Sequence, residues 1–436
     1  MFRNPMFIHD IQQVKTLFKS LPGTFLGVGM TAFSRILPAS FLENYHILAL
    51  HKTGDLPLLR KKVPVFCLEE ETDMPASAPG QNSAGLLAHP QTRRFLDTIS
   101  GPKYFFLYQD YPELRSAATT HGWNLLANPP QLRLAIGKRR FFKKMVADLN
   151  LHPAPGDIHP IEVIHKKGYE DWRYLLGPDF VVQLPEIERG GGRGTFFIHT
   201  MEDYQQLQNR LAENRWRNTP LESVSIHQFL HGTPASMVIC VTRHGTLVSS
   251  LQRQLLDIPC CGNFAEDGVF CGHAWGASPG SRAAYNSAFE QACRMGVGLG
   301  TLGYKGILGI DFIVHETQGK AWPIEINPLV FQPPVPENGN QEPLRPGLYE
   351  YGPKKVGRGE RFFALIKETL EYGDIQNENQ FILSDGPRST PGGDSHSRLC
   401  RLLFSYPVMD TQGALSPQAR LAAEWVREHA LKGDTT

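Results

Sequence analysis

Apolar and polar positions divide the first part of the chain into alternating strand-like and helix-like segments. Short apolar runs stand at 24–29, 45–50, 63–68 and 104–109, with polar or helical stretches between them. Strands that alternate with helices are typical of a parallel α/β layer. The pattern therefore predicts a small α/β domain at 1–130, which ends at the boundary sequence Asn128-Pro129-Pro130.

Beyond that boundary, the pattern predicts a mixed region of helices and longer strands. Residues 131–149 carry apolar positions at helical spacing beneath a run of basic residues. This favours an amphipathic helix with a charged outer face over a nucleic-acid patch. A second helix is predicted at 281–300, and a last one beginning at Ser416. Strands are predicted at 180–184, 195–199, 224–230, 235–242 and 246–256.

Two carboxylates interrupt a pair of strand-like runs in the stretch 306–328. Asp311 lies inside an apolar run, and Glu325 and Asn327 alternate along the next run. A three-residue turn, with Gly319 in the left-handed conformation, would pair Glu316 with Lys320 and place Asp311 opposite Glu325. A turn of two residues would put the two acids on opposite faces. Clustered oxygen donors suit Mg²⁺, whereas an exposed polar hairpin face would need no ion.

Glycines cluster in the sequence RGGGRG at 189–194, which joins one predicted strand to the next. Such a loop can bring several backbone N–H groups and two arginines close to a polyphosphate, although a flexible hairpin tip has the same composition. It does not lead into a helix, so it is neither a Walker-type loop nor a dinucleotide fingerprint. Gly27 and Gly29 lack the third glycine of that fingerprint, which favours a tight turn there.

Composition and charge exclude several classes of function. The chain has 436 residues, of which 41% are hydrophobic and 20% charged, as in ordinary soluble proteins. A net charge of +1 gives no support for nucleic acid as a partner. There is no secretory signal pattern and no apolar run of membrane-spanning length, and the seven cysteines lack framework spacing. We therefore expect a cytoplasmic protein without nucleic-acid or membrane partners; a homodimer is left open.

Taken in chain order, these motifs resemble the ATP-grasp superfamily over about residues 130–330. The shared elements are a lysine that opens a helix, a strand leading to a glycine-rich hairpin, a hinge, and Asp followed by Glu-x-Asn. The resemblance implies an α/β and α+β protein in which two α+β lobes sandwich the nucleotide. It implies a pre-ATP-grasp domain at 1–130, an ATP-grasp domain at 131–335 with the mobile glycine-loop lobe within 179–250, and an extension of unknown role at 336–436.

The resemblance also implies roles for individual residues. Asp311, Glu325 and Asn327 would bind Mg²⁺, with Mn²⁺ as an alternative, and Lys138 would reach the phosphates of ATP. Arg193 and Arg253 are candidates for contact with phosphate or substrate. The loop that closes over the phosphates would consist of Gly190, Gly191, Gly192 and Gly194. The hinge that binds adenine would consist of His227, Gln228, Phe229 and Leu230.

Three positions depart from the family pattern. Gln183 stands where most members carry a second lysine, His227 and Gln228 replace an acidic pair, and Leu329 stands where an arginine is usual. The implied activity is an ATP-dependent ligase that activates a carboxylate as an acyl-phosphate and joins it to an amine, with an amino acid or peptide as substrate. The alternatives are a non-catalytic ATP-binding or scaffold protein and an ATP-dependent phosphotransferase.

Overall fold

A computed structural model shows that the chain divides into two compact units. One unit comprises Met1–Pro130, Glu350–Ser405 and Pro417–Thr436, and the other comprises Gln131–Tyr349 and Tyr406–Ser416. The structure describes residues 15–16, 18–32, 35–52, 56–72, 82–107, 110–185, 194–216, 219–242, 245–257, 268, 270–274, 279–315, 317–327, 347–351, 385–387 and 398–404.

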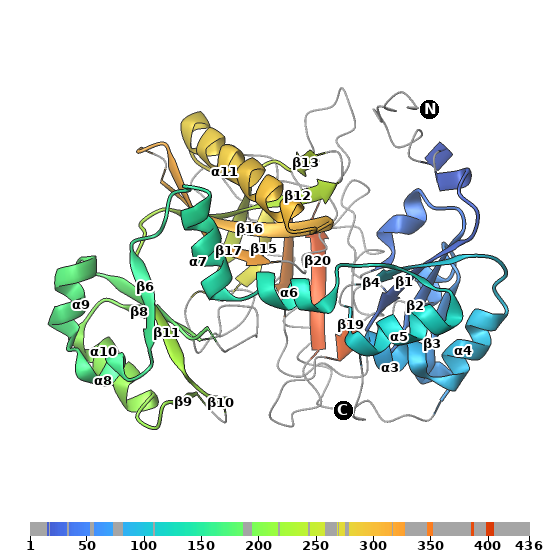
Figure 1. Cartoon of the computed structure of the whole chain (residues 1–436), viewed down its shortest axis with the longest axis horizontal. Coiled ribbons are helices and arrows are strands. Elements are labelled where there is room, and N and C mark those ends of the chain that lie inside the picture. Colours follow the sequence, from blue (N-terminus) through green and yellow to red (C-terminus); the bar gives the residue numbers. More distant parts are fainter. Residues whose placement is uncertain are drawn as a thin grey trace, which may run out of the picture. The chain divides into compact units, whose positions relative to one another are not determined.

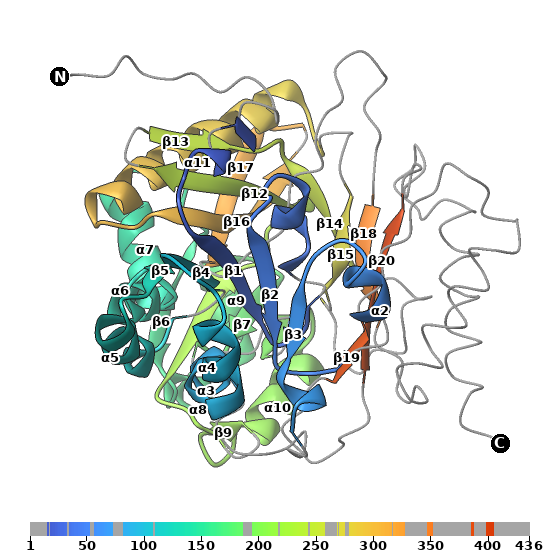
Figure 2. The same ribbon diagram turned by 90° about the vertical axis from the view of Figure 1, so that its right-hand side faces the viewer.

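The first unit contains a parallel five-stranded sheet with the order β3-β2-β1-β4-β5 (Figure 2). Alternating residues of its strands enter two apolar cores, one on each face, as expected for a buried parallel sheet. The predicted parallel α/β layer is thus confirmed. The strands are β1 (Thr24–Gly29), β2 (Tyr45–Ala49), β3 (Val65–Cys67), β4 (Lys103–Leu107) and β5 (Asn124–Leu126). The helices are η2 (Leu37–Ser40), α2 (Leu56–Leu59), η3 (Leu68–Glu70), α3 (Ser83–Ala88), α4 (Pro90–Asp97) and α5 (Pro112–His121).

The two glycines of β1 make room for side chains from neighbouring segments. A Cβ on Gly27 would lie 1.8 Å from the hydroxyl of Tyr45, and one on Gly29 would lie 3.2 Å from two atoms of the Arg35 side chain. The Tyr45 hydroxyl donates to the Arg35 carbonyl at 2.7 Å, and Arg35 Nε donates to the Val28 carbonyl at 2.7 Å. These glycines therefore serve packing within the unit, and the expected tight turn is not the reason for them.

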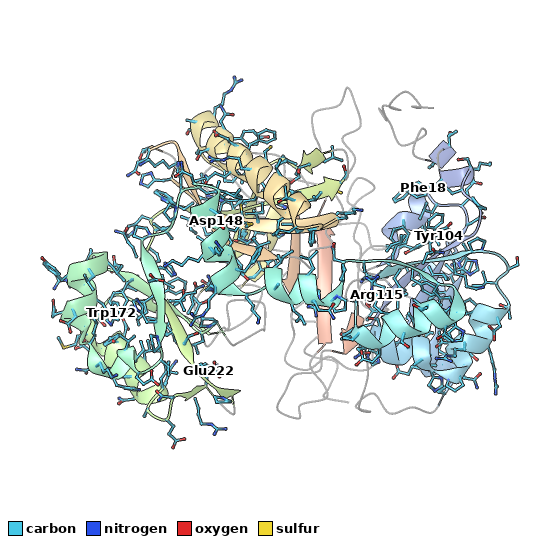
Figure 3. The ribbon with its side chains drawn as sticks, in the orientation of Figure 1. Phe18, Tyr104, Arg115, Asp148, Trp172 and Glu222 are labelled. Carbon is cyan, nitrogen blue, oxygen red and sulfur yellow. The ribbon has the colours of Figure 1, made fainter. Side chains whose placement is uncertain are left out.

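The second unit contains a small lobe built on the antiparallel sheet β6-β11-β7-β8. Trp172, labelled in Figure 3, lies in its core with Tyr204. The Trp172 indole N–H donates to the Tyr204 hydroxyl at 2.9 Å. The strands are β6 (Gly156–Pro160), β7 (Phe180–Gln183), β8 (Thr195–Ile198), β9 (Arg215–Trp216), β10 (Thr219–Pro220) and β11 (Ser223–Gln228). The helices are α8 (Val163–Lys166), α9 (Tyr169–Leu176) and α10 (Met201–Arg210).

The larger lobe is an antiparallel sheet with the order β17-β16-β12-β14-β15-β18, and β13 pairs with β12. Helix α11 lies along one face of this sheet and shares the largest apolar core with it (Figure 1). The strands are β12 (Thr233–Thr242), β13 (Gly245–Val248), β14 (Gln252–Leu256), β15 (Phe270–Ala274), β16 (Gly306–His315), β17 (Lys320–Asn327) and β18 (Gly347–Tyr351). The helices are α6 (Pro130–Ile136), α7 (Arg139–Asp148) and α11 (Arg282–Thr301).

Two of the predicted elements are each divided into two shorter elements in the structure. The single helix predicted at 131–149 is two helices, with Gly137 and Lys138 between them. The single strand predicted at 246–256 is β13 and β14, separated by residues 249–251. Later in the chain, β19 (Asp385–Pro387) pairs antiparallel with β20 (Arg398–Phe404), and the helix predicted from Ser416 lies outside the described residues. No helix in the described part of the chain is long and apolar enough to span a membrane.

Candidate functional site

The site is built on the hairpin of β16 and β17, where Asp311 lies directly opposite Glu325, as predicted. The predicted turn is nevertheless wrong. His315, and not Glu316, pairs with Lys320, so the turn has one residue more than expected. The register then shifts between Asp311 and Phe312, where Ile324 is an extra residue on β17. The longer turn and the bulge cancel, and the carboxylates meet as predicted.

The three predicted oxygen donors lie on one face of the sheet. Asn327 pairs with Gly309 two positions from Asp311, and its Nδ2 donates to Asp311 Oδ2 at 2.8 Å. The Glu325 side chain is 47% exposed and available to a ligand. The opposite face of the same strands packs against α11 through residues such as Ile310 and Ile326. Alternation along the strands therefore separates a polar site from the apolar core.

The environment of Asp311 disfavours a negative charge in the absence of a cation. Its pKa is raised to about 8, first by burial and then by the charge of Glu325, against hydrogen bonds from Gln254 and Asn327 that lower it. A proton or a cation relieves this repulsion. The chemistry of the donor set, two carboxylates and an amide, fits Mg²⁺. Within the described residues, no group of three or more His, Cys, Asp and Glu side chains is placed to hold a metal ion, so this set depends on its amide.

Gln254 is a member of the site that the sequence did not single out. β12 pairs with both β16 and β14, and Ser236 lies opposite Asp311 on one side and Gln252 on the other. Gln252 and Gln254 therefore point to the face of Asp311, whereas Arg253 lies opposite the buried Ala235 on the core face. The sequence could not give this register, so Arg253 was selected for its charge and not for its position in β14.

Helix α7 brings basic side chains to the same region. Lys138 is the N-cap residue of α7, so it stands at the start of a helix, as predicted. Its side chain is exposed. Arg139, expected on the outer face, is only 20% exposed. Lys143 Nζ donates to the Gly156 carbonyl at 2.8 Å and forms an ion pair with Asp157. α7 thus joins the large lobe to the first strand of the small lobe.

His227 lies on the small-lobe sheet near these basic residues. Its pKa is lowered to about 4, chiefly by burial and then by the positive charges of Arg139 and Lys143. The ring is therefore neutral at neutral pH, and its Nε2 lies 2.7 Å from the hydroxyl of Ser225. A neutral imidazole here differs in charge from the acidic side chain that the family pattern leads one to expect.

The predicted hinge, 227–230, consists of the last two residues of β11 and the two residues that follow. The Gln228 amide donates to the backbone carbonyl of Pro155 at 2.8 Å, and the Phe229 amide donates to the backbone carbonyl of Asp179 at 3.1 Å. Within the described residues, the Leu230 amide makes no backbone hydrogen bond of this kind. The Phe229 ring packs edge-on against the rings of Phe197 and His231.

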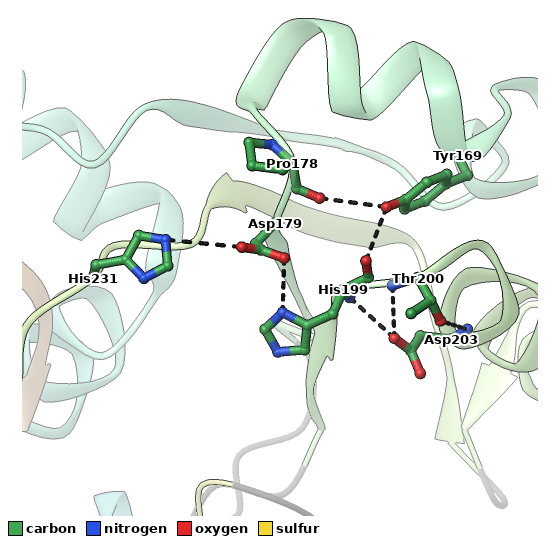
Figure 4. A network of polar contacts seen from close by, with 7 residues as sticks. All are labelled: Tyr169, Pro178, Asp179, His199, Thr200, Asp203 and His231. Carbon is green, nitrogen blue, oxygen red and sulfur yellow. Dashed lines mark hydrogen bonds and ion pairs between the residues drawn. The ribbon is translucent and has the colours of Figure 1, made fainter.

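A polar network holds the end of this hinge to the small lobe (Figure 4). Asp179 lies 2.9 Å from His199 Nδ1 and 3.8 Å from His231 Nε2, so its carboxylate joins β8 to the hinge. Nearby, the Tyr169 hydroxyl donates to the carbonyls of Pro178 and His199 at 3.4 and 3.0 Å. Sequence reasoning missed Asp179 because its partners are 20 and 52 residues away.

The glycine-rich segment joins β7 to β8, which pair antiparallel as predicted. Gln183 pairs with Thr195 at the end of this hairpin next to the glycine-rich segment, and their side chains lie 3.4 Å apart. Gly194 has a left-handed backbone with φ of 81°. The remaining predicted residues of the loop, Gly190, Gly191, Gly192 and Arg193, lie outside the described residues, as do Leu329 and Glu316.

Comparisons with known proteins find similarity in structure. No protein-family model and no curated protein sequence matches the chain. Carboxyaminoimidazole ribonucleotide synthase from Aspergillus clavatus, complexed with ATP, has a TM-score of 0.53 at 11% identity, covering 94% of this chain and 98% of that one. Phosphoribosylamine–glycine ligase from Thermotoga maritima has a TM-score of 0.54 at 12% identity, covering 93% and 96%. Pyruvate carboxylase of Rhizobium etli has a TM-score of 0.51 at 13% identity, covering 88% and 36%.

All three proteins are members of the ATP-grasp superfamily. The chain therefore has the ATP-grasp fold, in agreement with the resemblance of its motifs. At identities this low the likeness concerns the fold, and the activity must be argued from the site.

Proposed function

We propose that the protein is an ATP-dependent ligase that activates a carboxylate as an acyl-phosphate and joins it to an amine. The observation that carries this proposal is the placement of Asp311, Glu325 and Asn327 together on the polar face of the β16–β17 hairpin, within an ATP-grasp fold. Carboxylates placed together without a partner are costly, so a cation that carries nucleotide explains the arrangement. Nucleotide binding gains support from similar structures with ATP and with ADP.

In the proposed reaction, a carboxylate oxygen of the substrate attacks the γ-phosphorus of ATP, and the bond to the β–γ bridging oxygen breaks to release ADP. The amine nitrogen then attacks the acyl carbon, loses a proton and expels phosphate. Mg²⁺ held by Asp311, Glu325 and Asn327 would supply charge stabilisation at the phosphates. Lys138 lies at the start of α7, where its exposed ammonium group can contact the phosphates of ATP. The Leu230 amide can donate a hydrogen bond to the adenine base.

We infer an amino acid or peptide as the substrate from two features of the small lobe. Gln183 supplies a hydrogen-bond donor without a positive charge, and it lies beside Thr195 at the mouth of the glycine-rich hairpin. A glutamine at this position, together with the glycine-rich sequence GRGTFF at 192–197, resembles a subgroup of amino-acid and peptide ligases within the superfamily. The amine partner is of the same small-molecule class.

The proposal is tested by incubating the protein with Mg²⁺, ATP and pools of amino acids and dipeptides, with ADP release and product mass measured together. A ligase gives ADP, phosphate and a product whose mass is the sum of both substrates less water. A phosphorylated product would identify a phosphotransferase. Nucleotide-dependent thermal stabilisation without turnover would identify a binding protein.

Replacement of one carboxylate tests the site itself. We expect Asp311→Asn to lower turnover by about 100-fold or more, since it removes an oxygen donor on which nucleotide positioning depends. Its thermal stability in the absence of metal should be retained, because the surroundings of this side chain already favour its uncharged form. Asp148→Asn, on the exposed end of α7, is the control and should keep full activity. Full activity of Asp311→Asn would overturn the assignment.

A further inference from the structure

The guanidinium of Arg139 reaches from helix α7 to strand β17 at the point where that strand bulges. Its Nη1 donates to the carbonyl of Ile324 at 3.3 Å, and its Nη2 lies 3.8 Å from Glu325 Oε2. α7 and β17 lie side by side in the large lobe (Figure 1). The side chain is 20% exposed, in contrast to its exposed neighbours Lys138 and Arg140.

The bulge decides the face on which Glu325 lies. From His315–Lys320 to Phe312–Pro323 the two strands pair residue by residue, and Ile324 is then left over. Without this extra residue, Asp311 would pair with Ile324, and Glu325 would take the face of Ala321, which is buried against α11. A carboxylate would then enter an apolar core, and the pair of acids would not exist.

A bulge leaves the extra residue out of the ladder, so its polar groups need other partners. Arg139 meets this need for the Ile324 carbonyl. The planar guanidinium can hold two acceptors at once in fixed geometry, which the flexible ammonium of a lysine does less well. The same group places a positive charge beside Glu325, whose carboxylate follows the bulge directly.

We propose that Arg139 is a positioning residue that fixes the β17 bulge and thereby sets Glu325 on the face of Asp311. The part that concerns metal binding rests on the proposed function, whereas the part that concerns the bulge does not. Arg139 acts through Ile324 and Glu325, and it is distinct from Lys138, which is placed to meet the nucleotide.

Hydrogen–deuterium exchange of the full chain tests the bulge without any ligand. We expect Arg139→Ala to increase exchange at the amides of residues 324–327, with little change in β12, and Arg140→Ala to leave all of these amides unchanged. Arg139→Gln keeps one donor for the Ile324 carbonyl and should show an intermediate effect. If Arg139→Ala does not fold, Arg139→Gln and Arg139→Lys carry the comparison. Unchanged exchange in every folded Arg139 variant would overturn the proposal.

Binding of Mn²⁺ in the presence of ADP, measured by electron paramagnetic resonance, tests the consequence for the acids. Loss of a group that orients a ligand typically weakens metal binding, so we expect about tenfold weaker Mn²⁺ binding in Arg139→Ala. Guanidinium ion added at millimolar concentration should restore part of the affinity in Arg139→Ala and none in Glu325→Gln. A merely structural role of Arg139 predicts no such rescue.

The two measurements separate the two proposals. If the unaltered protein binds no Mn²⁺ with ADP, the proposed function fails, and the exchange data still decide the role of Arg139. If the protein binds Mn²⁺ and Arg139→Ala binds it equally well, the positioning role fails, and the proposed function stands.

Discussion

The surroundings of two residues in this protein, Asp311 and His227, determine whether each side chain carries a charge. Asp311 is an acid inside an apolar strand, and its raised pKa follows from burial and from Glu325. His227 is a base beside two cations, and its pKa is lowered to about 4 by burial and by those charges. The sequence identified both positions. It could not give their protonation, because the neighbours that set it come from other elements.

His227 should make the stability of the protein depend on pH. Its pKa falls from 6.5 in the unfolded chain to about 4 in the folded one, so the folded protein binds fewer protons between these values. Stability is therefore fully present above about pH 6.5 and is lost as the pH falls through about 4. We expect His227→Gln to lose less stability than the unaltered protein between pH 7 and pH 4.

Urea denaturation at a series of pH values measures this difference, and the two proteins serve as each other's reference. Ser225, which contacts the His227 ring, remains as a partner for the glutamine amide. Curves that fall in parallel over this range would contradict the assigned neutral state of His227.

At the scale of elements, sequence patterns located most strands, but they could not predict turn lengths or bulges. The turn between β16 and β17 and the bulge at Ile324 each shift the register by one residue, and the prediction of Asp311 opposite Glu325 succeeded because the shifts cancel. The bulge has a partner in Arg139, 185 residues away in sequence. Local periodicity cannot include such a contact, which also explains why Arg139 was expected at the surface.

The turn of this hairpin gives a prediction about stability. Gly319 has φ of 61°, and a Cβ there would lie 2.8 Å from the Cβ of Ala283. Gly303 has φ of 85° with no atom within 4 Å of such a Cβ. We expect Gly303→Ala to cost about 1 kcal/mol through backbone strain, and Gly319→Ala about 2–4 kcal/mol, since crowding adds to the strain. Equal losses in urea denaturation would show that the contact with Ala283 relaxes freely.

At the scale of the whole molecule, the alternation of strands and helices was sufficient to predict a parallel sheet, and the motifs were sufficient to predict an ATP-grasp fold. The elements of the small lobe were harder to predict from the sequence. Its strand β6 and the short helices α8 and α9 have only a few residues each, too few for periodicity to distinguish them from loops. The substrate cannot be predicted from the fold, because one fold serves many reactions.

Hydrogen–deuterium exchange with a non-hydrolysable ATP analogue and Mg²⁺ tests which unit binds nucleotide. The proposed contacts, Lys138, Leu230 and the acids of β16 and β17, all belong to the unit that begins at Gln131. We expect slower exchange at the hinge 227–230 and in β16 and β17, and little change in β1, β2 and β4. Asp311→Asn should abolish the effect at β16 and β17. Protection confined to the parallel sheet would place the nucleotide in the wrong unit for our proposal.

The cancelling shifts in the β16–β17 hairpin also restrict how this segment can change in length. Adding or removing one residue between the two carboxylates would send Glu325 to the buried side, unless the bulge were lost or gained in the same step. Deletions in pairs, or a shorter turn together with a straight strand, would keep the acids facing each other. If this hairpin is grafted onto another protein, the length of its turn and the bulge in β17 should therefore be transferred together.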